Sequence, residues 1–210
     1  MGYAVGKAPA LALLVGVLLL GGCGSAGEVV IPTDDDGLHG ARLDQPYTAP
    51  TAPLTATDGS SYSLADSTDK PLTLVFFGYT SCPDICTIVM SSLAAAVNRL
   101  DDAQREQVDV VFVTTDPTVD DAEKVRRFVG RFDPDFIGLT GDLDTIIADA
   151  GALAVAVEKG DKLPSGGYAV AHGAQVIGIS ADDRAHVVWN EETSAADFAD
   201  DIATLLDEGA

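Results

Sequence analysis

The chain has 210 residues, which is enough for one packed domain with additional segments. Its 33 acidic residues outnumber its 12 lysines and arginines, so the net charge is −21 at pH 7. Such a surface repels phosphate groups, which argues against binding to nucleic acid or to anionic lipid head groups. The acidic surface suits a basic or metal-bearing protein partner, or it serves only to keep the chain in solution.

The first 22 residues are typical of a bacterial lipoprotein signal peptide. Lys7 precedes the apolar stretch Ala8–Leu20, which is shorter than the roughly 20 residues of a spanning helix but suits a signal-peptide core. Small residues then lead to Cys23. We expect cleavage before Cys23, lipid on this cysteine and a location at the extracytoplasmic face of the cell membrane. The alternative is that Cys23 is an ordinary thiol on an uncleaved anchor.

Residues 24–53 have the composition of a tether. They contain four of the ten prolines and the acidic run Asp34–Asp36, with little apolar periodicity. His39 lies in this segment and is expected to be solvated. The folded domain is therefore predicted to cover residues 54–210.

The domain opens with the pattern of a β-hairpin and continues with a strand–helix–strand unit. The hairpin is predicted over residues 54–64, around Asp58 and Gly59. Residues 72–77 and 108–114 are apolar runs of strand length, which is typical of buried parallel strands. Between them, apolar residues at helical spacing predict a helix from Pro83 to about Leu100.

The second half predicts two further helices, three strands and a closing helix. The predicted helices cover about residues 120–132 and 142–150, followed by a strand at 153–157 and an antiparallel pair at 175–180 and 186–189. The last helix, residues 194–206, begins at Ser194 as its cap. This order predicts an α/β domain of the thioredoxin-like fold, with a central mixed sheet flanked by helices and an N-terminal β-hairpin.

Cys82 and Cys86 carry the chemistry of the domain, since Cys23 is assigned to lipid. Residues four apart on a helix have Cβ atoms about 5–6 Å apart, which admits a disulfide or two thiolates on one metal. Both cysteines are expected in the first turn of the helix, where the free N–H groups and the positive end of the dipole favour the thiolate form. Helix phase places Cys86 on the core side, whereas Cys82 lies one turn earlier. We therefore expect Cys82 to be the more exposed thiol and to be alkylated first.

A third ligand is needed if the two sulfurs bind a metal. Two soft sulfurs favour Cu(I), and an additional nitrogen ligand would let the same site hold Cu(II). His172 is the candidate, because it lies in a glycine-flanked segment, Gly166–Gly173. A solvent-facing loop histidine is the alternative. His186 opens a predicted strand, where a role in packing or surface pairing is expected.

The stretch Gly78–Cys86, which reads GYTSCPDIC, resembles the signature of the Sco (SenC/PrrC) family. These are membrane-anchored, thioredoxin-like proteins tied to copper delivery for cytochrome c oxidase. The segment Thr114–Asp120 resembles the Asp-Pro loop of that family, and His172 falls where the family's distant histidine ligand is expected. The resemblance covers residues 54–206. It is weaker around the histidine, because Ala171 and Gly173 stand where family members usually carry Asp and Ser or Thr.

The resemblance implies a mononuclear copper site formed by Cys82, Cys86 and His172. Copper, as Cu(I) or Cu(II), would arrive from an upstream donor and pass to the dinuclear centre of cytochrome c oxidase subunit II or another acceptor. Asp84 and Asp116 are expected to border the site. The altered residues beside His172 are expected to affect copper affinity through the orientation of the ring.

The main alternative function is a thiol–disulfide reductase that keeps the acceptor cysteines reduced. Cys82 and Cys86 would then be the redox pair and would close a disulfide. Thioredoxin-type exchangers have two residues between their cysteines and a cis-proline before a later strand, whereas here three residues intervene and the later segment carries His172. These features favour metal binding, and whether the protein is also an enzyme stays open.

A further alternative is an assembly factor or sensor that works without copper and docks a partner. The predicted helix at 120–132 carries a basic cluster that could serve as a docking patch. The alternative is that the cluster is simply the solvated face of an amphipathic helix. Its members are Lys124, Arg126, Arg127 and Arg131.

Overall fold

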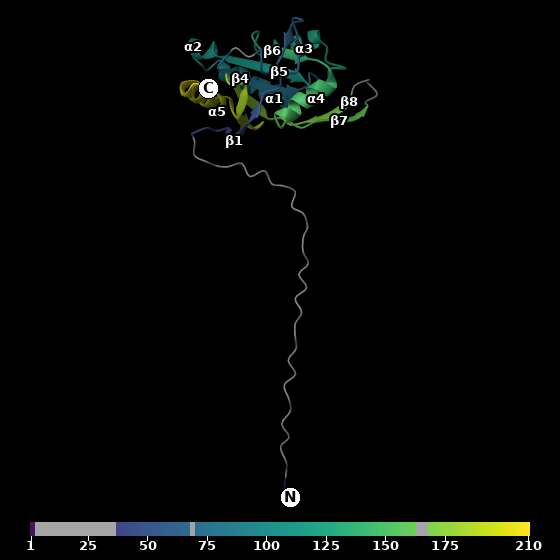
Figure 1. Ribbon diagram of the computed structural model, residues 1–210, viewed down its shortest axis with the longest axis vertical. Helices are drawn as coiled ribbons and strands as arrows, with labels where there is room; N and C mark the ends of the chain where they lie inside the picture. The colour runs from purple at the N-terminus through teal and green to yellow at the C-terminus, as the bar shows by residue number, and fades with distance from the viewer. Residues whose placement is uncertain (3–36, 68–69, 163–167) are drawn as a thin grey trace. The chain divides into compact units, whose positions relative to one another are not determined.

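A computed structural model describes residues 1–2, 37–67, 70–162 and 168–210, with side chains described outside residues 159–172. Its elements follow one another as Figure 1 shows. The strands are β1 (Ala41–Thr48), β2 (Leu54–Ala56), β3 (Ser61–Tyr62), β4 (Leu72–Gly78), β5 (Val108–Thr114), β6 (Ile137–Thr140), β7 (Val157–Lys162), β8 (Tyr168–His172), β9 (Val176–Ser180) and β10 (Arg184–Trp189). The helices are α1 (Ile85–Val97), α2 (Asp102–Arg105), α3 (Ala122–Val129), α4 (Leu143–Ala152) and α5 (Ala195–Glu208).

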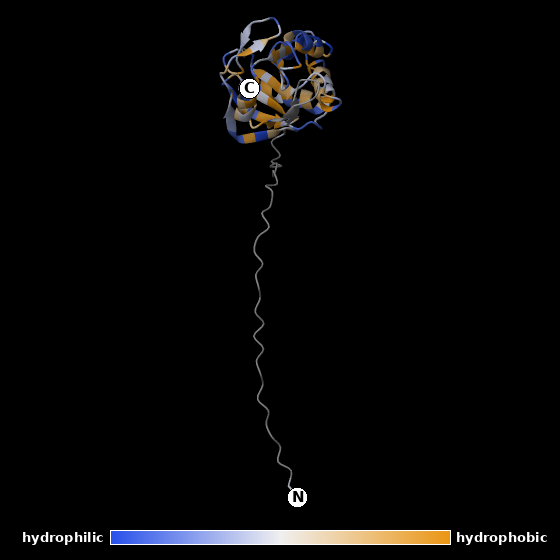
Figure 2. Cartoon of the chain, turned by 90° about the vertical axis from the view of Figure 1, so that its right-hand side faces the viewer, coloured by the Kyte–Doolittle hydropathy of each residue, from blue (hydrophilic) through white to orange (hydrophobic). Residues whose placement is uncertain are grey.

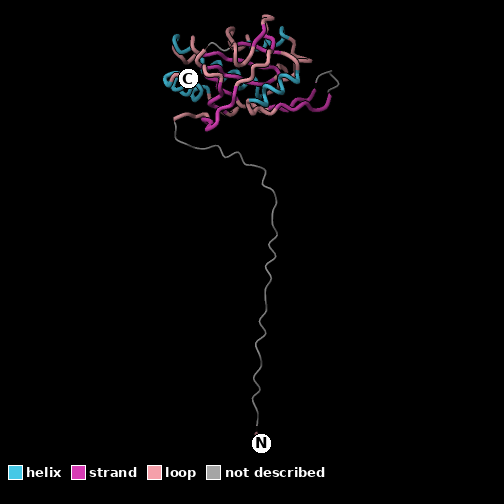
Figure 3. The backbone as a smooth tube through the Cα atoms, viewed as in Figure 1, coloured by secondary structure: helices cyan, strands magenta, loops and turns pink. Residues whose placement is uncertain are grey.

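The main sheet is mixed, as the sequence predicted. Its strand order is β1-β10-β9-β4-β5-β6-β2-β3, and Figure 3 traces these strands in magenta. The central strands β4, β5 and β6 are parallel, with Leu72 opposite Val108, whereas β9 runs antiparallel to β4. The predicted hairpin is the β2–β3 pair, and β7 with β8 forms a separate two-stranded sheet. The parallel strands bring the loops that follow β4 and β5 to one edge of the sheet.

Alternate residues of β4 supply two hydrophobic cores. Leu74 and Phe76 pack with α1, α3 and α5 on one face, and Val75 and Phe77 pack on the other face with α4. Figure 2 shows the apolar residues gathered in the central strands. All seven residues of β4 are buried, which explains its continuous apolar sequence. Cys86 belongs to the first core, so the second cysteine is part of the packing as well as of the site.

The predicted tether is wrong over residues 41–48, because they form the edge strand β1, paired with β10. The chain just before β1 is held by the buried Asp201 carboxylate. It accepts hydrogen bonds from the His39 and Gly40 amides and from Trp189 Nε1, the last two at 2.8 and 2.6 Å. A Cβ on Gly40 would lie 2.5 Å from this Trp189 nitrogen, so the close approach requires glycine. The folded domain therefore begins before Leu54.

Several predicted boundaries also differ from the structure. Helix α1 begins at Ile85 rather than Pro83, and α3 is shorter than predicted, with Asp121 as its N-cap. Of the predicted strand at 153–157, residues 153–156 form a turn after α4 and only Val157 belongs to a strand, as the first residue of β7. Leu153 and Val155 are buried, and packing of the turn accounts for the alternating pattern. Short helix α2 was not predicted.

Residues 3–22 of the predicted signal peptide and Cys23 lie outside the described residues. No helix in the described part of the chain has the length and apolar character needed to cross a membrane.

Asp149 of α4 should make the stability of the domain depend on pH. Its side chain is buried, Oδ2 has no hydrogen-bond partner in the described structure, and burial raises its pKa from 3.8 to about 6. As pH rises from about 4, the unfolded chain ionises at Asp149 while the folded chain keeps the proton, so folding loses free energy until pH passes about 6.

We expect Asp149→Asn to remove this loss. The unfolding free energy of the variant relative to wild type should rise by about 2 kcal/mol between about pH 4 and about pH 7.5. Urea unfolding of both proteins across this pH range measures the difference. A destabilisation by the amide that does not depend on pH does not affect the change of this difference with pH. A difference that stays flat with pH would contradict the prediction.

Candidate metal centre

The two loops singled out in the sequence meet at the carboxyl ends of β4 and β5. The Thr115 amide donates to the Gly78 carbonyl at 2.6 Å, which joins the Asp-Pro loop to the start of the cysteine loop. Cys82 lies in the loop after β4, outside α1, and is half-buried. The prediction that it lies in the first helical turn is therefore wrong, although its greater exposure than Cys86 is confirmed.

Cys86 is the second residue of α1 and is fully buried. Its amide donates to Cys82 Sγ at 3.4 Å, and both cysteines are free thiols. A Cβ on Gly78 would lie 2.9 Å from Cys86 Sγ, so the glycine at the end of β4 leaves room for this sulfur. The fold thus holds two sulfurs side by side at the mouth of α1.

The two thiols differ in acidity. Partial burial raises the pKa of Cys82, but hydrogen bonds from the Cys86 thiol and amide, the Asp84 amide and the Tyr79 hydroxyl outweigh it and leave the pKa below its ordinary value. Burial, followed by the Cys82 sulfur that accepts its proton, raises the pKa of Cys86 strongly. Cys82 is therefore the more acidic thiol of the pair, and the Cys86 thiol donates a hydrogen bond to its sulfur.

This asymmetry predicts the order of alkylation. In the reduced chain at about pH 7.5, iodoacetamide is expected to modify Cys82 at least ~10-fold faster than Cys86, because Cys82 is both more exposed and more ionised. Mass spectrometry of peptides from timed samples measures both rates. Comparable rates, or faster modification of Cys86, would show that the thiolate has been assigned to the wrong residue.

Tyr79 is a site residue that the sequence reasoning missed. Burial raises its pKa, and the sulfurs of Cys82 and Cys86 and the Asp116 carboxylate raise it further, which places the hydroxyl beside the sulfur pair. Its position three residues before Cys82 was the available signal. Asp116 lies near the Tyr79 hydroxyl and so borders the sulfur pair, as expected. Partial burial, followed by the charge of Asp120, raises the pKa of Asp116. Asp84 is adjacent only through its backbone, because its side chain is exposed and makes no cap hydrogen bond.

Asp120 is the second residue that was missed, since it was predicted only as a helix start. Its carboxylate is 1% exposed. It accepts hydrogen bonds from the Thr80 amide at 2.7 Å, the Thr80 hydroxyl at 2.5 Å and the Thr114 hydroxyl at 2.8 Å. One buried carboxylate therefore fixes the cysteine loop to the end of β5.

The histidine predicted as the third ligand lies at the end of a strand. His172 ends β8, where its backbone pairs with Val157, and its side chain lies outside the described part. Among the described side chains, no group of three His, Cys, Asp or Glu is arranged to hold a metal ion. His172 therefore stays a predicted ligand. The His186 ring lies 3.0 Å from the Asp182 carboxylate, which confirms a surface pairing, and exposed His39 is held through its amide.

The SCO1/SenC family model matches residues 41–207 of this chain. The chain belongs to the SCO1/SenC family. The match begins at the first residue of β1, in agreement with a domain that includes this strand.

Two curated relatives illustrate the similarity. The zebrafish (Danio rerio) protein SCO2 homolog, mitochondrial, is 31% identical over 130 residues, which cover 61% of this chain and 47% of the relative. A protein of Stutzerimonas stutzeri named for copper binding is 28% identical over 135 residues, covering 59% of this chain and 66% of the relative. The chain thus matches less than two thirds of the length of either relative.

Solved Sco structures share the fold. Apo Sco1 from Thermus thermophilus has a TM-score of 0.70 at 29% identity, and the match covers 81% of this chain and 96% of that one. ScoI from Arabidopsis thaliana, solved with copper bound, has a TM-score of 0.65 at 26% identity over 78% of this chain and 98% of that one. The thioredoxin-like fold predicted from the sequence is confirmed.

Proposed function

We propose that this Sco protein is a membrane-anchored copper carrier that delivers copper to the dinuclear centre of cytochrome c oxidase subunit II. The observation that carries the proposal is the pair of free sulfurs, Cys82 and Cys86, in contact at the mouth of α1 in a chain of this family. Solved relatives from Arabidopsis thaliana and Bradyrhizobium japonicum hold copper.

The donor set suits copper as cargo. Two soft sulfurs favour Cu(I), and the imidazole of His172, the proposed third ligand, would add a nitrogen that also suits Cu(II). The loop that carries Cys82 is held by Asp120, and the helix that carries Cys86 is packed in the core. The sulfurs therefore need little rearrangement to bind a metal.

The proposed anchor is a lipid on Cys23, after removal of a signal peptide at residues 1–22. The support is the sequence pattern of a short apolar stretch and small residues before the cysteine. In this proposal the tether is shorter than residues 23–53, because β1 begins at Ala41.

A copper titration of the full chain tests the proposal. The chain carries Cys23→Ser, is kept in nonionic detergent, and is titrated with Cu(I) without oxygen against a competing chelator. We expect one tightly bound copper per chain and weaker binding in His172→Ala. The matched control is His186→Ala, which removes an imidazole paired with Asp182 at the surface. Binding that ignores His172, or is absent in wild type, would overturn the three-ligand site.

The alternative of a thiol–disulfide reductase is supported by the unequal acidity of the thiols. The Cys82 thiolate would attack a disulfide of the acceptor and form a mixed disulfide. Cys86 would then attack Cys82 Sγ and release the acceptor as a dithiol. The acceptor gains two electrons and two protons, and the chain is left with a Cys82–Cys86 disulfide. Rapid exchange without copper binding would favour this function.

A further inference from the structure

A cationic hollow lies beside the cysteine loop. Its volume is about 310 Å³, and three of its lining side chains are cations while none is acidic. One lining residue, Thr80, stands two positions before Cys82, so the hollow borders the loop that carries the exposed sulfur. The lining residues are Thr80, Lys124, Arg127, Phe128 and Arg131.

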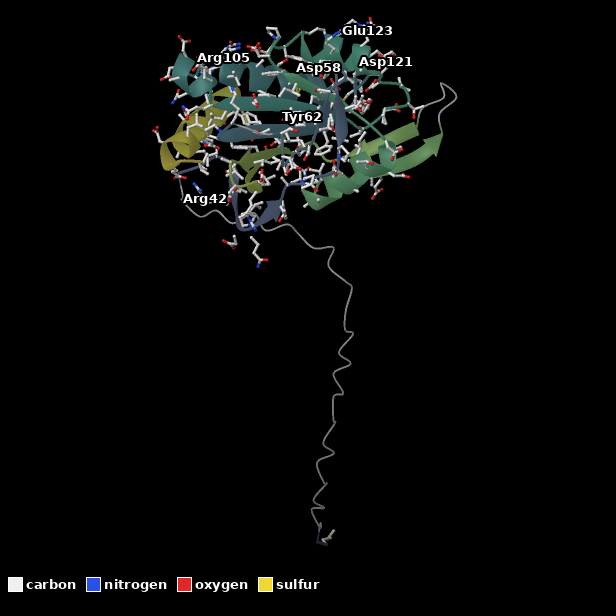
Figure 4. All side chains as sticks on the ribbon, turned by 45° about the horizontal axis from the view of Figure 1, so that its top comes forward. Arg42, Asp58, Tyr62, Arg105, Asp121 and Glu123 are labelled. Carbon is white, nitrogen blue, oxygen red and sulfur yellow. The ribbon has the colours of Figure 1, made fainter. Side chains whose placement is uncertain are left out.

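This concentration of positive charge stands out in so acidic a chain. Four of the 12 lysines and arginines fall within residues 124–131, on α3 and the turn after it. Figure 4 shows Asp121 and Glu123 at the start of α3, and Glu123 pairs with Arg127. Beyond that pair, the rest of α3 presents cations next to the sulfur site.

Arg127 pairs with Glu123, whereas the other two cations that line the hollow, Lys124 and Arg131, are held in place without an ion pair among the described residues. The Arg131 guanidinium carbon lies 4.9 Å from the centre of the Phe128 ring and 5.8 Å from that of Phe132. Such stacking orients the planar group but leaves its N–H donors for a carboxylate. Lys124 Nζ donates a hydrogen bond to the Val119 carbonyl at 2.5 Å. The pKa of Asp116 is raised by burial and by Asp120, and the charge of Lys124 opposes that rise in part. Within the described residues, Arg126 and Arg131 have no carboxylate at ion-pair distance.

We propose that the cationic hollow docks an acidic segment of the protein whose thiols react with Cys82. The inference rests on the proposed function in one respect, that Cys82 and Cys86 act on the thiols of a partner. Charges beyond about 8 Å are largely screened at physiological salt, so the cations of the hollow act on a bound segment more strongly than the distant acids do. The carboxylates close by are Glu123, which pairs with Arg127, and Asp116, which interacts with Lys124. The same cations steer the encounter and orient the partner's thiols toward Cys82.

The net charge of the chain and the charge of the hollow have opposite effects on an acidic peptide. The net charge repels the peptide and should slow its reaction, whereas the hollow attracts the peptide and should speed the reaction. The reduced full chain with Cys23→Ser, free of copper, is mixed with a peptide whose two cysteines form a disulfide flanked by glutamates. A matched peptide has glutamines instead. Exchange leaves a Cys82–Cys86 disulfide and a peptide dithiol, with two electrons and the two thiol protons passing to the peptide. Stopped-flow fluorescence gives the second-order rate.

We expect the glutamate peptide to react at least ~10-fold faster than the glutamine peptide at low salt, with the advantage lost at high salt. Arg127→Gln combined with Arg131→Gln should remove most of that advantage. The matched control combines Arg99→Gln with Arg184→Gln, two exposed cations on other elements, and should retain it.

A glutamate peptide that reacts more slowly than the glutamine peptide, or an equal effect of both double variants, would overturn the docking surface. Copper is absent from this assay, so its outcome is independent of the copper titration. A chain that fails to bind copper but prefers the acidic peptide would keep the docking surface with the reductase function.

Discussion

Cys86→Ser is expected to cause a large loss of copper affinity, matched among conservative changes only by Cys82→Ser. A serine hydroxyl has nearly the same size, but it cannot supply a soft, anionic ligand near neutral pH. The loss of Cu(I) affinity should exceed the roughly 10–100-fold typical when a residue behind a metal ligand is removed. Competition with a chelator measures it, on protein whose folding is checked by urea unfolding.

Two further variants make this result specific. Cys86→Ala should weaken copper as much as Cys86→Ser, because both remove the sulfur. Cys82→Ser should do the same, although Cys82 is the more exposed thiol. If Cys86→Ser kept affinity within about threefold of wild type, the buried sulfur would not be a ligand and the carrier function would lose its main support.

Asp120→Asn is expected to affect both stability and copper binding. The Asp120 carboxylate accepts three hydrogen bonds from Thr80 and Thr114, and an amide offers one oxygen while its NH₂ faces the same donors. Loss of charge-assisted hydrogen bonds at a buried site should lower the unfolding free energy by about 2–3 kcal/mol. The freed cysteine loop should weaken copper by roughly 10–100-fold.

Asp121→Asn is the matched control, because it removes the same charge one residue away. Asp121 is exposed and caps α3 through the Lys124 amide. Its loss should cost at most about 1 kcal/mol and leave copper affinity unchanged. If Asp120→Asn lowered stability but bound copper as tightly as wild type, Asp120 would be a structural residue that does not position the site.

The cysteines, the Asp-Pro loop and the cationic hollow share the carboxyl ends of the parallel strands. Thr80 connects them, since it precedes Cys82, lines the hollow and binds Asp120. A variant at Asp120 is therefore also expected to alter the edge of the docking surface. The peptide assay therefore uses changes on α3 and the turn after it, away from the loop that holds Cys82.

The sequence by itself determined the central strands and singled out the pair of cysteines. Residues 72–77 are buried on both faces and residues 108–114 are buried except for half-buried Asp109, so each segment is a largely apolar run of strand length. The sulfur pair was recognisable because two cysteines four residues apart, next to a predicted helix start, can come close enough to share a disulfide or a metal.

Only the tertiary structure decided where the domain begins and what supports the site. Strand β1 mixes half-buried and exposed residues, so it lacks clean alternation, and its partner β10 lies far along the chain. Asp120 binds Thr80 across 40 residues, and Asp201 binds the His39 amide across 162 residues. A buried carboxylate looks like any surface acid in a chain with 33 of them, because its role depends on donors that only folding brings to it.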